Sequence, residues 1–201
     1  MKIAIISGSH RSEGESHRVA RYIQKRLEEL GVSDVYLFTL ADNPLPLWDE
    51  GIWEEDPKWQ QLWEPIQEQL RIAEGFVIVS PEWSGMVPAG LKNFFLLCAK
   101  DVLAHKPALI VTVSASMGGA YPVAELRTSS YKNTRICYIP DHVIIRNVGQ
   151  MLQGEQPANE QDAAVRQRLT YCLKVLIEYT KALRAVRSSG VIDLKTFPYG
   201  M

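Results

Sequence analysis

Residues 76–95 read FVIVSPEWSGMVPAGLKNFF, and this stretch indicates the fold class. The run from Phe76 to Pro81 is almost continuously apolar, which is typical of a strand buried on both faces of a sheet. A loop between Pro81 and Pro88 follows, and apolar positions from Leu91 onward then recur at helical spacing. A buried strand followed directly by a helix is the repeating unit of an α/β fold with a parallel sheet.

The same alternation of apolar runs and helical patterns extends over the rest of the chain. Further strands are predicted at residues 3–7, 35–40, 108–114 and 142–145, with residues 137–139 close to the last of them. Helices are predicted from Ser16, as the N-cap, to Gly31, and over residues 58–74 with an interruption at Pro65, 120–131 and 159–185. Residues 41–57, rich in Pro, Asp and Trp, are predicted to form a long loop. Five strand-then-helix units predict a five-stranded parallel sheet in a three-layer sandwich, with helices on both faces.

The composition limits the class of protein. The chain has 201 residues, which corresponds to one domain when a domain has roughly 100–200 residues. Its 22 Lys and Arg residues and 23 Asp and Glu residues leave a net charge of −1, so no bulk positive charge is available for a nucleic-acid backbone. We therefore expect one domain over residues 1–187, a tail over residues 188–201 and no nucleic-acid partner.

The apolar segments are too short for a membrane protein. The run at residues 3–6 is shorter than the apolar region of a signal peptide, which has about 7–15 residues, and no stretch reaches the roughly 20 apolar residues of a membrane span. Cys98, Cys137 and Cys172 are odd in number and widely spaced, which argues against a disulfide framework or a zinc site. We expect a cytoplasmic protein with no membrane partner and no metal.

In a parallel sheet, ligands bind beyond the carboxyl ends of the strands, so the loops that follow the strands are searched for chemistry. The loop at residues 8–17 reads GSHRSEGESH. Its glycines permit a tight turn, its hydroxyls and helix amides can donate to an anion, and Arg11 adds a planar, positively charged donor. These features favour a phosphate site. A polar turn with a serine helix cap is the alternative, and Glu13 and Glu15 oppose a phosphate unless both point to solvent.

Two more loops have unusual sequences. Residues 80–88 read SPEWSGMVP, a rigid loop that can present backbone amides to a flat polar ring, or a surface loop with Trp83 packed against it. Residues 114–121 read SASMGGAY, whose small residues permit close approach by a planar ligand, or form a turn at the start of a helix that needs positive φ. Together the three loops favour a planar heterocycle with a phosphate tail, which is a mononucleotide-like cofactor.

The residues of these loops carry a resemblance to a known family. GSHRSEGES at residues 8–16, PEWSGMVPAGLKNFF at residues 81–95 and SASMGGAYP at residues 114–122 match three family motifs in order and spacing. The chain resembles the NAD(P)H-dependent FMN reductases, a flavodoxin-like group that includes quinone, azo-dye and chromate reductases. The resemblance runs from about residue 3 to residue 185 and implies a flavodoxin-like, FMN-binding domain. In two places the chain departs from the family pattern, with Gly14 in place of a serine and Trp83-Ser84 in place of Tyr-Asn.

The resemblance implies a role for each loop. The phosphate of FMN would contact Ser9, Arg11, the amide of Gly14, Ser16 and His17. The edge of the isoalloxazine ring would run along Pro81, Glu82, Trp83, Ser84, Gly85 and Met86. The other polar edge of the ring would lie near Ser114, Ser116, Met117, Gly118 and Gly119. Lys92 and Asn93 would be structural, with the asparagine holding the loop that precedes it.

The resemblance also implies an activity. Hydride would pass from NADPH or NADH to flavin N5, and electrons would then pass to a quinone, a free flavin or a similar small acceptor, with no catalytic side chain. A homodimer or homotetramer is implied as well. Two alternatives stay open, a non-enzymatic flavodoxin-like electron carrier and a flavin-free binding protein of the same fold. Two interpretations also stay open for Trp48, Trp53, Trp59 and Trp63, namely a lid or subunit interface, and packing that anchors a long loop.

Overall fold

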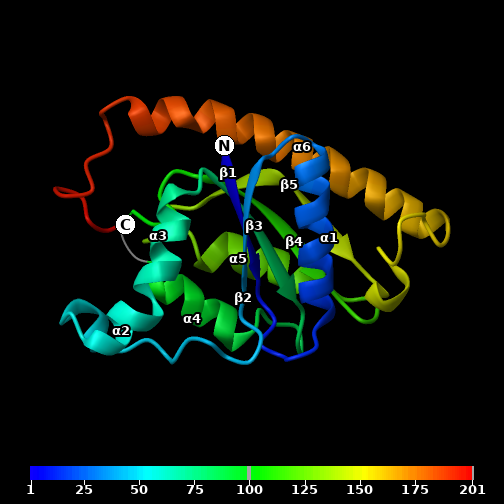
Figure 1. Cartoon of the computed structure of the whole chain (residues 1–201), viewed down its shortest axis with the longest axis horizontal. Coiled ribbons are helices and arrows are strands. Elements are labelled where there is room, and N and C mark those ends of the chain that lie inside the picture. The colour runs from blue at the N-terminus through cyan, green and yellow to red at the C-terminus, as the bar shows by residue number, and fades with distance from the viewer. Residues whose placement is uncertain (99–100, 201) are drawn as a thin grey trace.

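The computed structural model describes residues 1–98 and 101–200 (Figure 1). Its strands are β1 (Lys2–Ser7), β2 (Asp34–Thr39), β3 (Gly75–Pro81), β4 (Pro107–Val113) and β5 (Cys137–Ile145). Its α-helices are α1 (Glu15–Glu29), α2 (Pro57–Leu62), α3 (Glu64–Ile72), α4 (Ala89–Leu97), α5 (Ala120–Ser129) and α6 (Glu160–Ser188). The strands form one sheet in the order β2-β1-β3-β4-β5, and all four pairings are parallel. This order is the flavodoxin-like one, so the predicted fold class is confirmed.

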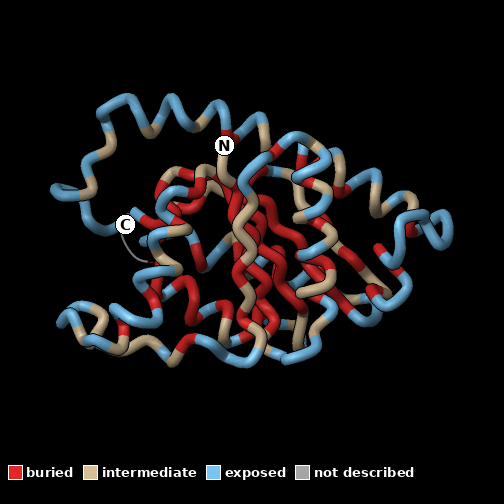
Figure 2. Tube along the Cα trace, in the orientation of Figure 1, coloured by how far each residue is buried: buried red, intermediate tan, exposed pale blue. Residues whose placement is uncertain are grey.

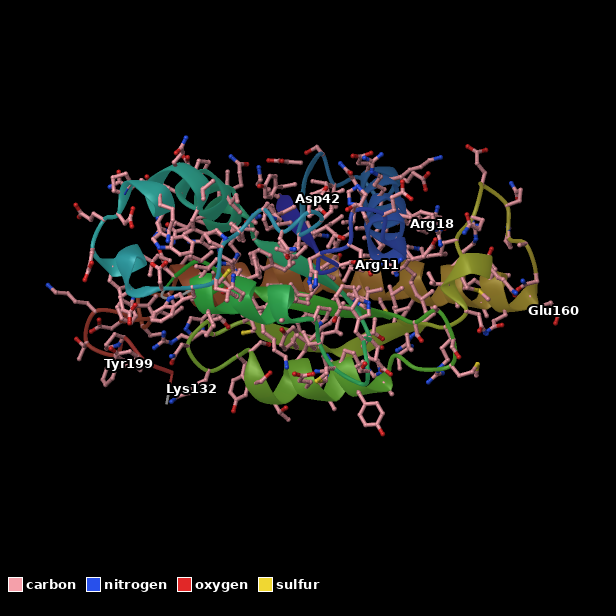
Figure 3. The ribbon with its side chains drawn as sticks, turned by 90° about the horizontal axis from the view of Figure 1, so that it is seen from below. Arg11, Arg18, Asp42, Lys132, Glu160 and Tyr199 are labelled. Atoms are coloured by element: carbon pink, nitrogen blue, oxygen red, sulfur yellow. The ribbon has the colours of Figure 1, made fainter. Side chains whose placement is uncertain are left out.

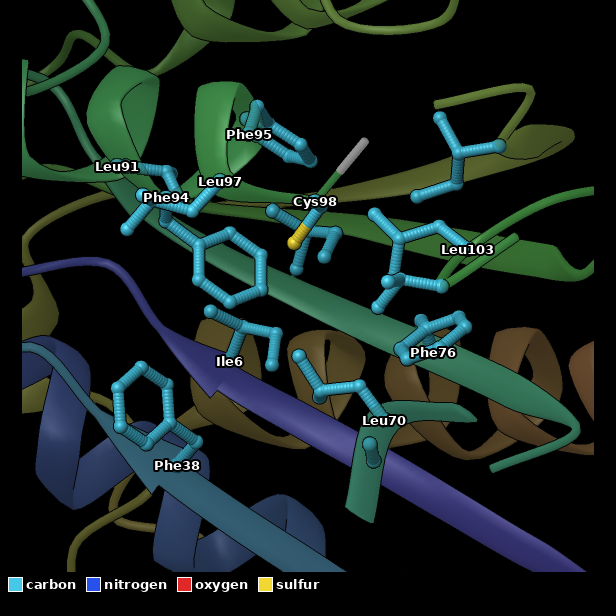
Figure 4. Packing of buried hydrophobic residues seen from close by; sticks show 14 of the residues in the cluster. Ile6, Phe38, Leu70, Phe76, Leu91, Phe94, Phe95, Leu97, Cys98 and Leu103 are labelled. Carbon is cyan, nitrogen blue, oxygen red and sulfur yellow. The ribbon is translucent and has the colours of Figure 1, made fainter. Parts of the chain in front are cut away.

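Alternate residues of the strands pack into two separate cores, one on each face of the sheet. On β1, Ile3 and Ile5 pack with residues of α1 and α6, and Figure 1 shows the long α6 beside α1. Ala4 and Ile6 face the opposite core, which is built with Phe94 and other residues of α3, α4 and α5 (Figure 4). The central strands are therefore the most deeply buried part of the chain (Figure 2). Burial on both faces explains why β3 and β4 are almost continuously apolar rather than alternating, with Ser80 and Thr112 as buried polar residues.

For helix α1, the predicted start is wrong and the predicted end is correct. The predicted N-cap, Ser16, lies inside the first turn, and the N-cap is Gly14, which provides no side-chain hydrogen bond. At the other end Gly31 has φ +88°, and its amide donates to the carbonyl of Glu28. A glycine in this conformation is the usual end of a helix, as predicted.

The segment at residues 41–57 is more ordered than the predicted long loop. It contains a 3-10 helix, Glu50–Trp53, and α2 begins at Pro57. Asp49 causes this order, because its carboxylate accepts hydrogen bonds from the amide of Gly51 (3.0 Å) and from the indole N–H of Trp59 (2.8 Å). The predicted break at Pro65 is confirmed, since α2 ends at Leu62 and α3 starts at Glu64.

The four tryptophans of this region divide into two groups. Trp59 and Trp63 are buried in the core beneath α4, which supports the interpretation as packing. Trp53 is 66% exposed and lies 5.0 Å, between ring centroids, from Trp48. The lid or interface interpretation stays open for Trp53.

Strand β5 joins the two short strands that the sequence predicts separately. Ala108 pairs with Tyr138 and Ile110 pairs with His142, so the strand bulges between these pairs. Pro140 lies in the bulge, where its missing N–H breaks no ladder hydrogen bond. Arg127 of α5 donates to the carbonyl of Pro140 (2.9 Å) and holds the bulge against the helix.

The tail lies away from the carboxyl ends of the strands. The guanidinium of Arg135, just before β5, donates to the carbonyls of Phe197 and Pro198. Phe197 and Tyr199 are 68% and 72% exposed, and Figure 3 labels Tyr199 near Lys132. The division into a domain at residues 1–187 and a tail stays a prediction.

Across the described residues, no helix is both long enough and apolar enough to cross a bilayer. The same residues contain no cluster of three or more His, Cys, Asp or Glu side chains that could hold a metal ion.

Candidate functional site

Three loops meet at one edge of the sheet. Strands β1, β3 and β4 are neighbours and run in the same direction, so the segments after Ser7, Pro81 and Val113 emerge side by side. The strand order reverses direction between β1 and β3, and the crevice at such a switch point is where open α/β sheets bind ligands. The structure brings the predicted site residues to this edge: Ser9, Arg11, Gly14, Ser16 and His17 in the first loop and the start of α1, Pro81 to Met86 in the second loop, and Ser114, Ser116, Met117, Gly118 and Gly119 in the third.

The first loop is held tightly against β3. The amide of Gly8 donates to the carbonyl of Val79 at 2.8 Å. A Cβ at Gly8 would lie 2.6 Å from the side chain of Leu91 and 2.9 Å from the same carbonyl, so only glycine fits. The chain therefore turns sharply from β1 toward α1 across the switch point.

The segment that leads into α1 has free donors. Gly14 caps the helix without a side-chain hydrogen bond. Within residues 1–98 and 101–200, the amides of Ser12, Glu13 and Gly14 have no protein acceptor, and the exposed guanidinium of Arg11 has no hydrogen bond or ion pair. Unpaired backbone amides at the entry to a helix, beside an unpaired cation, form an anion site.

The other charged residues near this loop either have partners within the protein or are exposed. Arg18, which Figure 3 labels on α1 near Arg11, donates to Glu15 (2.8 Å) and to the carbonyls of Val148 and Leu152 (both 2.8 Å). Glu13 and Glu15 are exposed. The two glutamates therefore face solvent, which removes the objection that the sequence raises against a phosphate at this loop.

Buried polar atoms without partners concentrate at the same loop. In the described part of the chain, four buried side-chain nitrogen or oxygen atoms lack a hydrogen bond, and three of them are Ser7 Oγ, His10 Nδ1 and His17 Nδ1. Buried polar atoms nearly always have a partner, so each exception calls for a physical reason. A polar ligand at the first loop would supply one for Ser7 and His17, whereas His10 Nδ1 faces Gly90 of α4, where a Cβ would lie 3.1 Å away.

The second loop is a tight hairpin-like turn. Trp83 and Met86 exchange backbone hydrogen bonds of 3.1 and 3.0 Å. Between them Ser84 and Gly85 both have positive φ, +51° and +74°, as in a two-residue hairpin turn of type I′. Met86 projects to solvent, being 52% exposed, while Trp83 is half-buried.

The Glu82 side chain joins the second loop to the third. Its carboxylate accepts hydrogen bonds from the amides of Gly119 (2.6 Å) and Tyr121 (3.3 Å) at the N-terminus of α5. Glu82 thus neutralises the positive end of α5 inside the protein, whereas the acidic residue in the first turn of α1, Glu15, is exposed and bonded to Arg18. We therefore expect a phosphate at the start of α1. This role of Glu82 has no signal in the sequence.

The glycines of the third loop are required by packing within the protein. A Cβ at Gly118 would lie 2.5 Å from a carboxylate oxygen of Glu82. Gly119 has φ +105°, and a Cβ there would lie 2.5 Å from the side chain of Ile144. The interpretation as a turn of positive φ at the start of a helix is confirmed for Gly119, and the close approach of a ligand stays a prediction.

The arrangement agrees with the family comparison. A family model described as NADPH-dependent FMN reductase matches residues 1–150. The chain belongs to this FMN reductase family.

Relatives of the chain include several curated enzymes. Residues of the chain are 29% identical over 123 positions to a quinone reductase of Pseudomonas putida, covering 59% of this chain and 63% of that one. They are 34% identical over 124 positions to a quinone reductase of Escherichia coli, covering 60% and 64%. The matched segment therefore spans less than two thirds of these relatives.

Solved structures show the same fold at lower identity. The flavoenzyme NAD(P)H:(acceptor) oxidoreductase of Paracoccus denitrificans has a TM-score of 0.69 at 16% identity, covering 90% of this chain and 97% of that one. An FMN-dependent NADH-azoreductase of Bacillus anthracis, solved in complex with FMN, has a TM-score of 0.57 at 15% identity, covering 90% and 100%.

The motif at the start of α4 has a structural role, but it holds a different segment from the one predicted. The Asn93 side chain accepts from the amide of Trp48 and donates to the carbonyl of Pro46, both at 2.8 Å. It therefore holds the segment after β2 rather than the loop that precedes α4, so that prediction was wrong. Lys92 forms an ion pair with Glu125 (2.5 Å), whose carboxylate also accepts from the amide of Val87.

His17 gives the folded chain a dependence on pH. Burial, and then the charge of Arg21, lower the pKa of this imidazole from its ordinary value of 6.5. The unfolded state therefore takes up a proton first as the pH falls, and we expect the free energy of unfolding to decrease below about pH 6.5. Denaturant titrations at pH 7 and pH 5 should show a smaller decrease for His17→Gln than for the wild-type chain. An equal decrease in both would contradict the prediction.

Restoring the family serine at position 14 should not improve the site. A Cβ at Gly14 would lie 2.8 Å from Ser9 Oγ, so the serine at position 9 would have to leave its rotamer, at a cost of about 0.5–1.5 kcal/mol. We expect Gly14→Ser to weaken FMN binding by about two- to tenfold in a fluorescence titration. Tighter binding would show that the loop rearranges around FMN.

Proposed function

We propose that the chain is an FMN-dependent NAD(P)H oxidoreductase, using NADPH or NADH as donor and a quinone, a free flavin or a similar small molecule as acceptor. The observation that carries the proposal is the contrast between two helix N-termini at the same edge of the sheet. That of α5 is neutralised by Glu82, while in the described part of the chain the segment leading into α1 has free amides, the unpaired Arg11 and orphaned polar atoms. The names of the curated relatives, quinone reductase and azoreductase, support the same reading.

The residues of the site fit FMN. Arg11 and the free amides before α1 would bind the phosphate, with Ser9, Ser16 and His17 around them. The turn at residues 83–86 and the backbone of the third loop would form the walls of the ring site. When bound, FMN supplies the redox chemistry, taking up hydride from the nicotinamide and passing electrons to the acceptor.

The protein itself contributes position and electrostatics. Glu82 fixes the third loop relative to the second, so the distance between these two walls of the ring site stays constant. The dipole of α1 and the charge of Arg11 favour the doubly negative phosphate. We assign no side chain as a catalytic acid or base, since none is needed for hydride transfer to a flavin. We also include in the proposal a cytoplasmic location and a homodimer or homotetramer.

The first test is the visible absorption spectrum of the purified chain during titration with FMN and then with NADPH under anaerobic conditions. A two-band flavin spectrum that loses intensity on addition of NADPH or NADH is expected. Bound flavin that neither donor reduces would contradict the proposal and indicate an electron carrier. Absence of binding at excess FMN would contradict the proposal and indicate a flavin-free binding protein. Riboflavin, which lacks the phosphate, is the matched control and should bind more weakly.

A further inference from the structure

His10 of the first loop touches Trp83 of the second. Their ring centroids are 4.6 Å apart, and the ring planes meet at 87°. An edge-to-face arrangement of this kind is one of the favourable geometries for aromatic pairs. Because β1 and β3 are neighbours, the contact spans the switch point where the cofactor is proposed to bind.

His10 is fixed from behind by α4. A Cβ at Gly90 would lie 3.1 Å from His10 Nδ1, so the imidazole occupies space that a side chain at position 90 would fill. The same Nδ1 atom is buried. The imidazole therefore cannot move toward α4, and it contacts the Trp83 indole.

The backbone of Trp83 is fixed from the other side. Trp83 is paired with Met86, and the preceding residue, Glu82, is bonded to the start of α5. With the backbone held, the direction of the indole depends on rotation about its side-chain bonds. The contact with His10 selects one direction, in which the half-buried indole stands against the first loop.

We propose that His10 is a positioning residue, which holds the Trp83 indole against the first loop and so keeps space beside the flavin ring open for planar aromatic acceptors. The inference rests on the proposed function. Without His10 the indole is free to rotate toward the ring site, where it competes with the acceptor. Two-ring acceptors need more of this space than one-ring acceptors, so they are the more sensitive to the position of the indole.

The test compares His10→Ala, His10→Phe, Trp83→Phe and the double variant His10→Ala/Trp83→Phe. For each we measure FMN affinity, and kcat and KM with a one-ring and a two-ring para-quinone. His10→Ala should raise KM for the two-ring quinone by about two- to tenfold, with smaller changes for the one-ring quinone and in kcat. His10→Phe keeps an edge-to-face partner and should restore wild-type KM. In the Trp83→Phe background, His10→Ala should have no further selective effect.

Equal KM values for His10→Ala and the wild type would overturn the inference, as would failure of His10→Phe to restore KM. A full effect of His10→Ala on KM in the Trp83→Phe background would overturn it too. Near-ultraviolet circular dichroism of the flavin-free chain supplies a readout that does not depend on activity. His10→Ala should change the tryptophan signal and His10→Phe should not. An unchanged signal in both variants would also contradict the inference that His10 positions the Trp83 indole. Absence of FMN binding by the wild type would instead refute the proposed function, so the two failures are distinguishable.

Discussion

Replacement of Arg11 by alanine is expected to weaken FMN binding by about 10- to 150-fold. A hydrogen bond to a charged group contributes about 1.5–3 kcal/mol, and each 1.4 kcal/mol changes a dissociation constant about tenfold. Arg11 is exposed and has no ion pair among the described residues, so its removal leaves no other protein group without a partner. The loss should therefore appear in ligand affinity and not in stability. Flavin fluorescence titration measures the first, and thermal unfolding of the flavin-free chain measures the second.

Two variants serve as controls for Arg11→Ala. Arg11→Lys keeps the charge but loses the planar pair of donors, so its affinity should lie between those of the wild type and the alanine variant. Lys25→Ala removes one positive charge from the exposed face of α1, where Lys25 contacts Glu155 at 3.4 Å, and should leave FMN affinity unchanged. Equal losses in Lys25→Ala and Arg11→Ala would indicate a general effect of net charge and would refute the phosphate site at the first loop.

Replacement of Asp162 by alanine is expected to destabilise the fold by about 3–5 kcal/mol, the usual cost of removing one partner from a buried ion pair. Asp162 is fully buried in the first turn of α6. Its carboxylate accepts from the amides of Leu152 (2.8 Å) and Ala158 (3.0 Å) and from Arg166 (3.2 Å). Without it, the segment that leads into α6 loses its anchor. Urea denaturation of the flavin-free chain measures the loss.

The contribution of Asp162 also depends on pH. Burial alone would raise the pKa of this carboxyl, but the hydrogen bonds from the Leu152 and Ala158 amides and the charge of Arg166 outweigh it and hold the pKa below 3.8. The stabilisation is therefore complete above pH 3.8 and is lost as the pH falls through the folded-state pKa. Asp193→Ala is the control, since Asp193 is an exposed turn residue of the tail and its removal should not alter the unfolding midpoint. Equal effects of the two variants would contradict the prediction.

The helices and strands that the sequence predicts well are those that are buried or interrupted by strong local signals. Strands β3 and β4 are almost continuously apolar because both faces are covered, and this pattern is visible without a structure. Pro65 and Gly31 act on their own backbone, so their effects are local too. Ser16 illustrates the limit of local reasoning. It has a side chain suited to an N-cap, but the helix begins two residues earlier, with Gly14 as an N-cap that provides no side-chain hydrogen bond.

The sequence by itself determined the α/β fold class, the three loops at the carboxyl edge of the sheet and the family, because periodicity, motif order and parallel topology are properties of the chain read along its length. The tertiary structure alone decided which charges are free at that edge. Glu82 meets the start of α5 37 residues later, Asn93 reaches back to Pro46 and Trp48, and His10 meets Trp83 across the switch point. Each pairing joins residues that are far apart in the chain, and their sequence positions carry no signal of the distance between their side chains once the sheet has formed.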